Sequence, residues 1–197
     1  GQCAINSLRQ LGVGTKHILR GGERLGIYFL EHGASQRPSK VVYDRAHSSI
    51  SQVQPGEFNW KEIFKDAAWF HFTGITPALG EGPAKVTLEA LQAAKAQGVT
   101  VSVDLNYRKK LWTPEQAKAT MSQFMEYVDV VIANEEDAEK VFGIKAGESN
   151  VTAGKLSEEG YKEVAQQLME RFNLKKVAIT LRESLSASDN NWSALPY

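Results

Sequence analysis

Residues 99–108 read VTVSVDLNYR, and this stretch decides the fold. From residue 99 to residue 105 every second residue is apolar, which is the side-chain period of a β-strand and predicts a strand with a buried face. A helix is predicted just before it, over Pro83–Gln97, because apolar residues recur there at helical spacing and Gly98 follows as a stop. A helix followed directly by a buried strand is the repeating unit of a parallel α/β sheet.

The same unit recurs on both sides of this stretch. Further strands are predicted over residues 67–73 (AAWFHFT), 128–133 (VDVVIA) and 176–181 (KVAITL). Thr113, followed by Pro114 and Gln116, forms a capping box that predicts a helix running to about residue 127. Asn134 can cap the next helix, which ends before Gly143, and Ser157 can cap a last one. Strands alternating with helices at this spacing predict an α/β fold with a mainly parallel sheet.

The first 50 residues follow a different pattern. Residues 1–11 suit a helix, and Arg24–Glu31 and Lys40–Arg45 are two strand-like runs joined through the turn-rich residues 33–39. Such a hairpin is too short to have a core of its own. It must lie on the main sheet, pair with a partner or act as a lid. Residues 145–154 (KAGESNVTAG) are polar and predict a surface loop.

Composition excludes several classes of protein. The chain has 197 residues, 42% of them hydrophobic, and a formal net charge of +0, which gives no electrostatic basis for binding nucleic acid. No apolar stretch approaches the roughly 20 residues that span a bilayer, and no secretory leader is recognisable. Cys3 is the single cysteine, which excludes a disulfide framework and fits a cytoplasmic protein. No common phosphate-binding glycine motif is present.

The end of the central strand is the first candidate site. Asp104, Asn106 and Arg108 follow one another at every second position, and ligands of open α/β sheets bind outside the carboxyl ends of strands. Alternation predicts Asp104 and Asn106 on one face and leaves Arg108 free in the loop. A guanidinium there can grip a carboxylate or phosphate at two points. The alternative is a strand-end turn in which the acid and amide serve the backbone and Arg108 is solvated.

Two further groups of residues are candidates. Tyr43 and Arg45 share one face of a predicted strand, and Tyr28 on the preceding strand can join them in a cradle for a polyhydroxylated acid. The alternative is an exposed edge strand with ordinary aromatic residues. Asn134–Asp137 places acidic residues in a first helical turn, where they complement the helix dipole by about 0.3–1 kcal/mol each. Their functional interpretation is a magnesium site reached through water, near nucleotide phosphates.

Taken in order, these runs resemble the 2-keto-3-deoxygluconate kinases of the PfkB (ribokinase-like) superfamily. The Asp-x-Asn-x-Arg run at 104–108 and the Asn-x-x-acid run at 134–137 are typical of the whole superfamily. Residues 26–40 and 41–48 (VVYDRAHS) point more narrowly to the ketodeoxygluconate branch. The resemblance covers essentially the whole chain. It implies a three-layer ribokinase-like fold, with a core formed by residues 1–23 and 47–197 and a β-lid formed by residues 24–46.

The resemblance also assigns roles to residues of this sequence. The positions that it matches to the sugar-acid pocket are Tyr28, Tyr43, Arg45, Ile75 and Arg108. Those that it matches to the nucleotide side are Asn134, Thr180 and Arg182, and Asp137 matches a position that helps to organise magnesium indirectly. Arg182 stands where a glycine is common in the family. The lid of such kinases often pairs between subunits, which implies a homo-oligomer.

The activity implied is transfer of the ATP γ-phosphoryl group, with Mg²⁺, to the terminal hydroxyl of 2-keto-3-deoxygluconate or of its galactonate epimer. The family's catalytic Asp lies in a Gly-Ala-Gly-Asp segment expected downstream of residue 197, and the core is expected to be incomplete at both ends. We therefore assign no catalytic residue within residues 1–197 and expect no turnover from them alone. The alternatives are a fructokinase- or ribokinase-like enzyme for a neutral sugar, or a catalytically inactive sugar-binding fragment.

Overall fold

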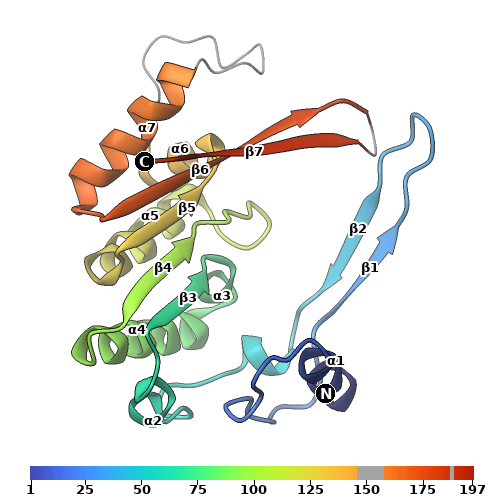
Figure 1. The fold of residues 1–197 in the computed structure, drawn as a ribbon. Coiled ribbons are helices and arrows are strands. Elements are labelled where there is room, and N and C mark those ends of the chain that lie inside the picture. The colour runs from blue at the N-terminus through green and yellow to red at the C-terminus, as the bar shows by residue number, and fades with distance from the viewer. Residues whose placement is uncertain (146–157, 187–188) are drawn as a thin grey trace.

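A five-stranded sheet forms the centre of the protein, as a computed structural model describes it for residues 1–145, 158–186 and 189–197 (Figure 1). Its strands lie side by side in chain order: β3 (Trp69–Thr73), β4 (Thr100–Asp104), β5 (Val130–Ala133), β6 (Lys176–Ser184) and β7 (Asn190–Pro196). The first four are parallel, and β7 pairs antiparallel with β6. The predicted α/β fold and its mainly parallel sheet are confirmed. β6 runs beyond its predicted end because it turns back into β7.

Helices connect the parallel strands: α4 (Glu81–Ala96), α5 (Pro114–Phe124) with a 3₁₀ turn at Met125–Tyr127, α6 (Glu135–Phe142) and α7 (Glu158–Phe172). Because the strands follow in chain order and such crossovers are right-handed, these helices lie on the same face of the sheet. Four strand residues on that face are fully buried: Val101, Val103, Val131 and Ile179. On the opposite face Trp69 is 56% exposed and Ile132 is partly exposed. The core therefore lies between the sheet and this helical layer.

The predicted capping residues and glycine stops are confirmed where the structure describes them, whereas α4 begins at Glu81, two residues before its predicted start at Pro83. Thr113 Oγ1 accepts from Gln116 N at 3.3 Å, and Gln116 Oε1 accepts from Thr113 N at 2.9 Å, so both halves of the capping box are present. Asn134 caps α6, and Gly98 and Gly143 end α4 and α6 with φ of +68° and +72°. The predicted cap Ser157, and the predicted loop from residue 146 onward, lie outside the described residues.

Smaller elements surround the edge of the sheet at β3. The segment from 49 to 78 contains a 3₁₀ turn at Ser49–Ser51, α2 (Trp60–Phe64) and α3 (Ile75–Ala78). The α2 aromatic rings pack on those of β3, with 5.0 Å between the ring centroids of Phe64 and Phe70. The predicted first helix forms as α1 (Gln2–Gln10), and none of its residues is buried. No described helix is long and apolar enough to cross a membrane.

A separate two-stranded sheet consists of β1 (Ile27–Glu31) and β2 (Lys40–Asp44), which pair antiparallel as predicted. In Figure 1 this hairpin stands apart from the five-stranded sheet, above α1. Its register places Tyr28 opposite Tyr43. At its tip Arg37 pairs with Glu31 and donates to the His32 carbonyl at 2.9 Å, which braces the turn. We call residues 24–46 the lid.

Candidate active site at the strand ends and the lid

The turn after β3 packs directly on the end of β4. Gly74 N donates to the Asp104 carbonyl at 2.8 Å. A Cβ added at Gly74 would lie 2.1 Å from the Leu105 carbonyl oxygen, a distance that real atoms do not adopt. Only glycine lets the two backbones approach this closely. Ile75, which was predicted to face the sugar acid, starts α3 immediately after this contact.

The loop after β4 departs from the predicted alternation. The strand ends at Asp104, and Asn106 adopts a φ of +43°, so the alternation from which we predicted Asp104 and Asn106 on one face stops before Asn106. Asparagine tolerates this left-handed conformation better than most residues. The turn directs the Asn106 amide toward the neighbouring strand, where it donates to Thr73 Oγ1 at 3.1 Å.

Arg108 follows this turn with its side chain exposed. Its Nη1 donates to the carbonyl of the adjacent Tyr107 at 2.8 Å, and the side chain stays in the loop, as predicted. The backbone of the loop is nevertheless fixed, because Tyr107 N donates to Asp137 Oδ1 at 2.9 Å. An exposed guanidinium on a fixed backbone is suited to two-point binding of a carboxylate or phosphate.

Asp137 is a buried carboxylate between the two loops, with only 5% of its surface exposed. Its pKa is raised to about 6, chiefly by burial and also by the nearby Asp104, although the amides of Tyr107 and Asn134 and the Arg108 cation act to lower it. Burial likewise raises the pKa of Asp104, against lowering by the Asn106 amide, His71 and Arg108. The buried Asp137 and the partly buried Asp104 lie near one arginine, so the charge balance of the site depends on what binds there.

The raised pKa of Asp137 predicts a specific pH dependence of stability. The folded-state pKa of about 6 lies above the ordinary value of 3.8, so the folded state holds the proton more tightly. This group's contribution to the free energy of unfolding should therefore fall as pH rises from about 4 to about 6 and stay low above that. Asp137→Asn, which keeps an oxygen for Tyr107 N, should be more stable than wild type at pH 7.

Denaturant unfolding at several pH values measures this difference. The exposed Asp66→Asn is the matched control, because it removes one acid without touching the site. Parallel stability curves for wild type and Asp137→Asn between pH 4 and 7 would contradict a penalty from burial.

The residues predicted on the nucleotide side lie on β6 and the start of α6. Thr180 Oγ1 donates to the Ala133 carbonyl at 3.4 Å, next to Asn134. Arg182 is exposed, donates through Nε to Asn190 Oδ1 at 2.8 Å, and lies 5.5 Å from the Trp192 ring centroid. Thr180 and Arg182 both lie inside β6 and pair with residues of β7. Arg182 therefore does not come after the strand, as the predicted strand end at residue 181 implied. The structure thus brings Thr180 close to Asn134 and places Arg182 farther along the hairpin.

The predicted cradle forms on one face of the lid. The rings of Tyr28 and Tyr43 have centroids 6.2 Å apart, and the Arg45 guanidinium lies 4.1 Å from the centroid of Tyr43. β2 ends at Asp44, so Arg45 lies one residue beyond the strand, and it still reaches the predicted neighbour. Tyr28 and Tyr43 are 65% and 50% exposed. The predicted sugar-acid residues therefore form two groups, one on the lid and one at the strand ends.

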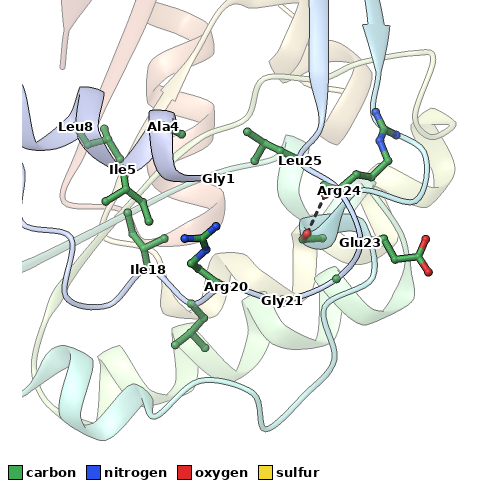
Figure 2. A pocket seen from close by; sticks show the side chains of 13 residues that line it. Gly1, Ala4, Ile5, Leu8, Ile18, Arg20, Gly21, Glu23, Arg24 and Leu25 are labelled. Carbon is green, nitrogen blue, oxygen red and sulfur yellow. Dashed lines mark hydrogen bonds between the residues drawn. The ribbon is translucent and has the colours of Figure 1, made fainter.

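A pocket at the foot of the lid contains none of the predicted site residues. Its volume is about 530 Å³, and α1 and residues 18–25 line it. Figure 2 shows Ile5 and Ile18 facing each other across it, with Arg24 at its edge. The Arg24 carbonyl accepts from Ser49 N and Oγ, both at 2.8 Å. The Arg24 guanidinium pairs with the Asp44 carboxylate at 2.7 Å, so Arg24 joins the two ends of the lid.

The sequence analysis assigned no role to Arg24, because its position predicts only the first residue of a strand. In the structure it precedes β1 and also donates to the backbone carbonyls of Asp44, at 3.1 Å, and of Ala46. The signal that could have found it is its opposite charge to Asp44 across a predicted antiparallel pair.

Arg24→Ala should free the base of the lid while leaving the five-stranded sheet intact. We expect faster hydrogen exchange of the amides of residues 27–44 and an almost unchanged melting temperature, because the side chain is outside the core. Arg20→Ala is the matched control, since Arg20 lines the same pocket and bonds to the side chain of Gln2 instead. Equal lid exchange in the two variants would contradict the role of Arg24.

The known proteins that this chain resembles are carbohydrate kinases. The pfkB family of carbohydrate kinases matches residues 1–183. The crystal structure of a 2-dehydro-3-deoxygluconokinase from Thermotoga maritima is 53% identical, with a TM-score of 0.93 over 100% of this chain and 57% of that one. A 2-dehydro-3-deoxygalactonokinase of Haloferax volcanii is 40% identical over 157 residues, which are 80% of this chain and 49% of the relative.

A more distant structure from E. coli, in complex with ATP and Mg²⁺, shares the fold at 16% identity, with a TM-score of 0.69 over 98% of this chain and 57% of that one. This chain thus spans about half the length of the relatives that it matches. The family match covers most of the chain, and the α/β sheet with its separate hairpin agrees with it. The chain belongs to the pfkB family of carbohydrate kinases.

Proposed function

We propose that the protein carrying this chain transfers the γ-phosphoryl group of ATP to the terminal hydroxyl of 2-keto-3-deoxygluconate, which is 2-dehydro-3-deoxygluconate under its other name. The observation that carries the proposal is the pair of arginines, Arg108 at the strand end and Arg45 on the lid. Tyr28 and Tyr43 add hydroxyls suited to a sugar chain, and Ile75 adds an apolar contact. Similarity to a 2-dehydro-3-deoxygluconokinase supports the same substrate.

The arginines favour a sugar acid over a neutral sugar. When the lid closes over the strand ends, both guanidinium groups lose water. A substrate carboxylate compensates for that loss, whereas fructose or ribose would leave a buried cation without a partner. Closure also holds the attacking hydroxyl at the distance that in-line transfer requires. In this proposal residues 24–46 move as the lid, and residues 1–23 and 47–197 belong to the core.

For the nucleotide we propose Asn134, Thr180 and Arg182. These residues follow β5 or lie in β6, whereas Ile75 follows β3 at the other end of the strand order. A structural relative is in complex with ATP and Mg²⁺. Asp137 fits only an indirect role, because its Oδ1 is already bonded to Tyr107 N and its side chain is buried. The described residues contain no group of three or more acidic, His or Cys side chains placed to hold a metal. Magnesium would then be held mainly by phosphates and water, and it would neutralise phosphate charge.

A coupled assay of the whole protein that carries this chain tests the activity, since residues 1–197 alone are expected to show no turnover. We expect ATP- and Mg²⁺-dependent phosphorylation of 2-keto-3-deoxygluconate, or of its galactonate epimer, with a much higher kcat/KM than for fructose or ribose. A preference for a neutral sugar would support the fructokinase- or ribokinase-like alternative. Calorimetric binding of the sugar acid without turnover would support a sugar-binding fragment. The cytoplasmic location stays a prediction from the single cysteine.

We further propose that the protein is a homo-oligomer that associates through the lid. The lid face away from Tyr43 carries Ile27, Phe29 and Val42, which are 46%, 60% and 49% exposed. An isolated two-stranded sheet is marginally stable at best in water, so apolar residues on both of its faces call for a partner. A second copy of the lid offers the same apolar surface and would cover this face.

Phe29→Asp should lower the oligomeric state by placing a charge in the centre of this face. Sedimentation velocity of the whole protein that carries this chain measures the change. Gln36→Asp, at the tip of the same hairpin, is the control and should leave the sedimentation coefficient unchanged. An identical coefficient for wild type and Phe29→Asp would contradict association through the lid.

A further inference from the structure

Thr73, the last residue of β3, joins the two loops that carry Ile75 and Arg108. Its hydroxyl oxygen accepts from the side-chain amide of Asn106 at 3.1 Å and from Ile75 N at 3.3 Å. A hydroxyl oxygen has two lone pairs, and these two donors occupy both. One side chain thereby fixes the start of α3 relative to the loop after β4. The sequence reasoning gave Thr73 no such role.

The loop after β4 is held from both sides. On the β3 side, Thr73 binds the amide of Asn106; on the α6 side, Asp137 Oδ1 accepts from Tyr107 N at 2.9 Å. Two consecutive residues are therefore anchored to two different elements, and Arg108 comes directly after them. The direction in which Arg108 leaves the backbone is set by this pair of anchors.

The backbone of Asn106 shows why the Thr73 contact matters. Its φ of +43° is unusual for a residue other than glycine, and such a conformation persists only where the surroundings hold it. The bond to Thr73 Oγ1 is available only when Asn106 has turned toward β3. Loss of the hydroxyl would leave the turn free to relax toward an extended backbone, which would redirect Arg108.

We propose that Thr73 is a positioning residue of the sugar-acid site, which acts through Asn106 and Ile75 to set the spacing between Ile75 and Arg108. The proposal rests on the proposed function, because that function places Ile75 and Arg108 against the substrate. Thr73 itself does not contact the substrate. Displacement of a binding group by about 1 Å can cost on the order of 100-fold in rate, so a positioning contact has a measurable effect.

Thr73→Val and Thr73→Ser, each made in the whole protein that carries this chain, form the matched test. Valine keeps the branched shape and removes the hydroxyl, whereas serine keeps the hydroxyl. We expect Thr73→Val to raise KM for 2-keto-3-deoxygluconate roughly 10-fold or more, with KM for ATP and the melting temperature close to wild type. Thr73→Ser should behave as wild type. If Thr73 had only a general structural role, Thr73→Val would instead lower the melting temperature and raise KM for both substrates alike. That result would overturn the proposal.

A second variant keeps the proposal testable if Thr73→Val does not fold. Asn106→Gly retains the left-handed backbone and removes the amide, so it should reproduce the rise in KM for the sugar acid. The double variant should be no worse than Thr73→Val alone, because Thr73→Val already removes the bond that Asn106→Gly removes. Additive losses, or a wild-type KM in Thr73→Val, would overturn the proposal. Wild type that phosphorylates no sugar acid would refute the proposed function itself, and the positioning role with it, before any substitution is compared.

Discussion

Arg108→Ala is expected to lower kcat/KM for 2-keto-3-deoxygluconate at least roughly 30-fold, which corresponds to a loss of about 2 kcal/mol or more of transition-state stabilisation. The guanidinium is exposed and bonds only to the adjacent Tyr107 carbonyl among the contacts described, so its fork is available to the substrate. The loss should fall mainly on the sugar acid. Activity on fructose, however low, should not decrease, because a neutral sugar has no carboxylate for Arg108 to bind.

Two controls separate charge, geometry and fold in this experiment. Arg108→Lys keeps the charge and removes the planar fork, so it should recover only part of the activity. Lys109→Ala removes the neighbouring exposed cation and should leave kcat/KM near wild type. An Arg108→Ala enzyme with unchanged kcat/KM for the sugar acid would refute the assignment of the carboxylate to this residue.

The parallel sheet was predictable because its signals are local. Residues 99–105 alternate, the capping box at Thr113 lies within four residues, and Gly98 and Gly143 occupy left-handed helix ends. Each of these patterns acts over one turn or one strand, so no knowledge of distant neighbours is needed. The β1–β2 pairing was predictable for the same reason, since its strands are adjacent in sequence.

The candidate site was only partly predictable because its contacts join distant parts of the chain. The bonds of Thr73 to Asn106 and of Asp137 to Tyr107 span 33 and 30 residues. Periodicity could not reveal that Asn106 leaves the strand with a positive φ, since its neighbours continue an apolar and polar alternation. The residue pattern singled out Arg108 and the acidic run that contains Asp137, and the resemblance to a family assigned them roles, but the backbone contacts that orient them depend on tertiary structure.

Gly74→Ala is expected to destabilise the protein at the upper end of the roughly 1–3 kcal/mol range for overpacking, or beyond it. The backbone itself does not resist alanine, because Gly74 has φ −59° and ψ −12°. Reduced freedom of the unfolded chain would even favour the substitution by about 0.4–1 kcal/mol. The whole loss must therefore come from the new Cβ, 2.1 Å from the Leu105 carbonyl oxygen.

Gly14→Ala isolates this steric effect. Gly14 has open space around its Cβ position and no positive φ, so alanine there should leave stability unchanged or slightly higher. Chemical unfolding of the two variants compares them directly. If Gly74→Ala matched Gly14→Ala, the close contact between the ends of β3 and β4 would be refuted. If it is strongly destabilised, the same shift must also separate Ile75 from the Arg108 loop, so the folded fraction of this variant should bind the sugar acid more weakly than wild type.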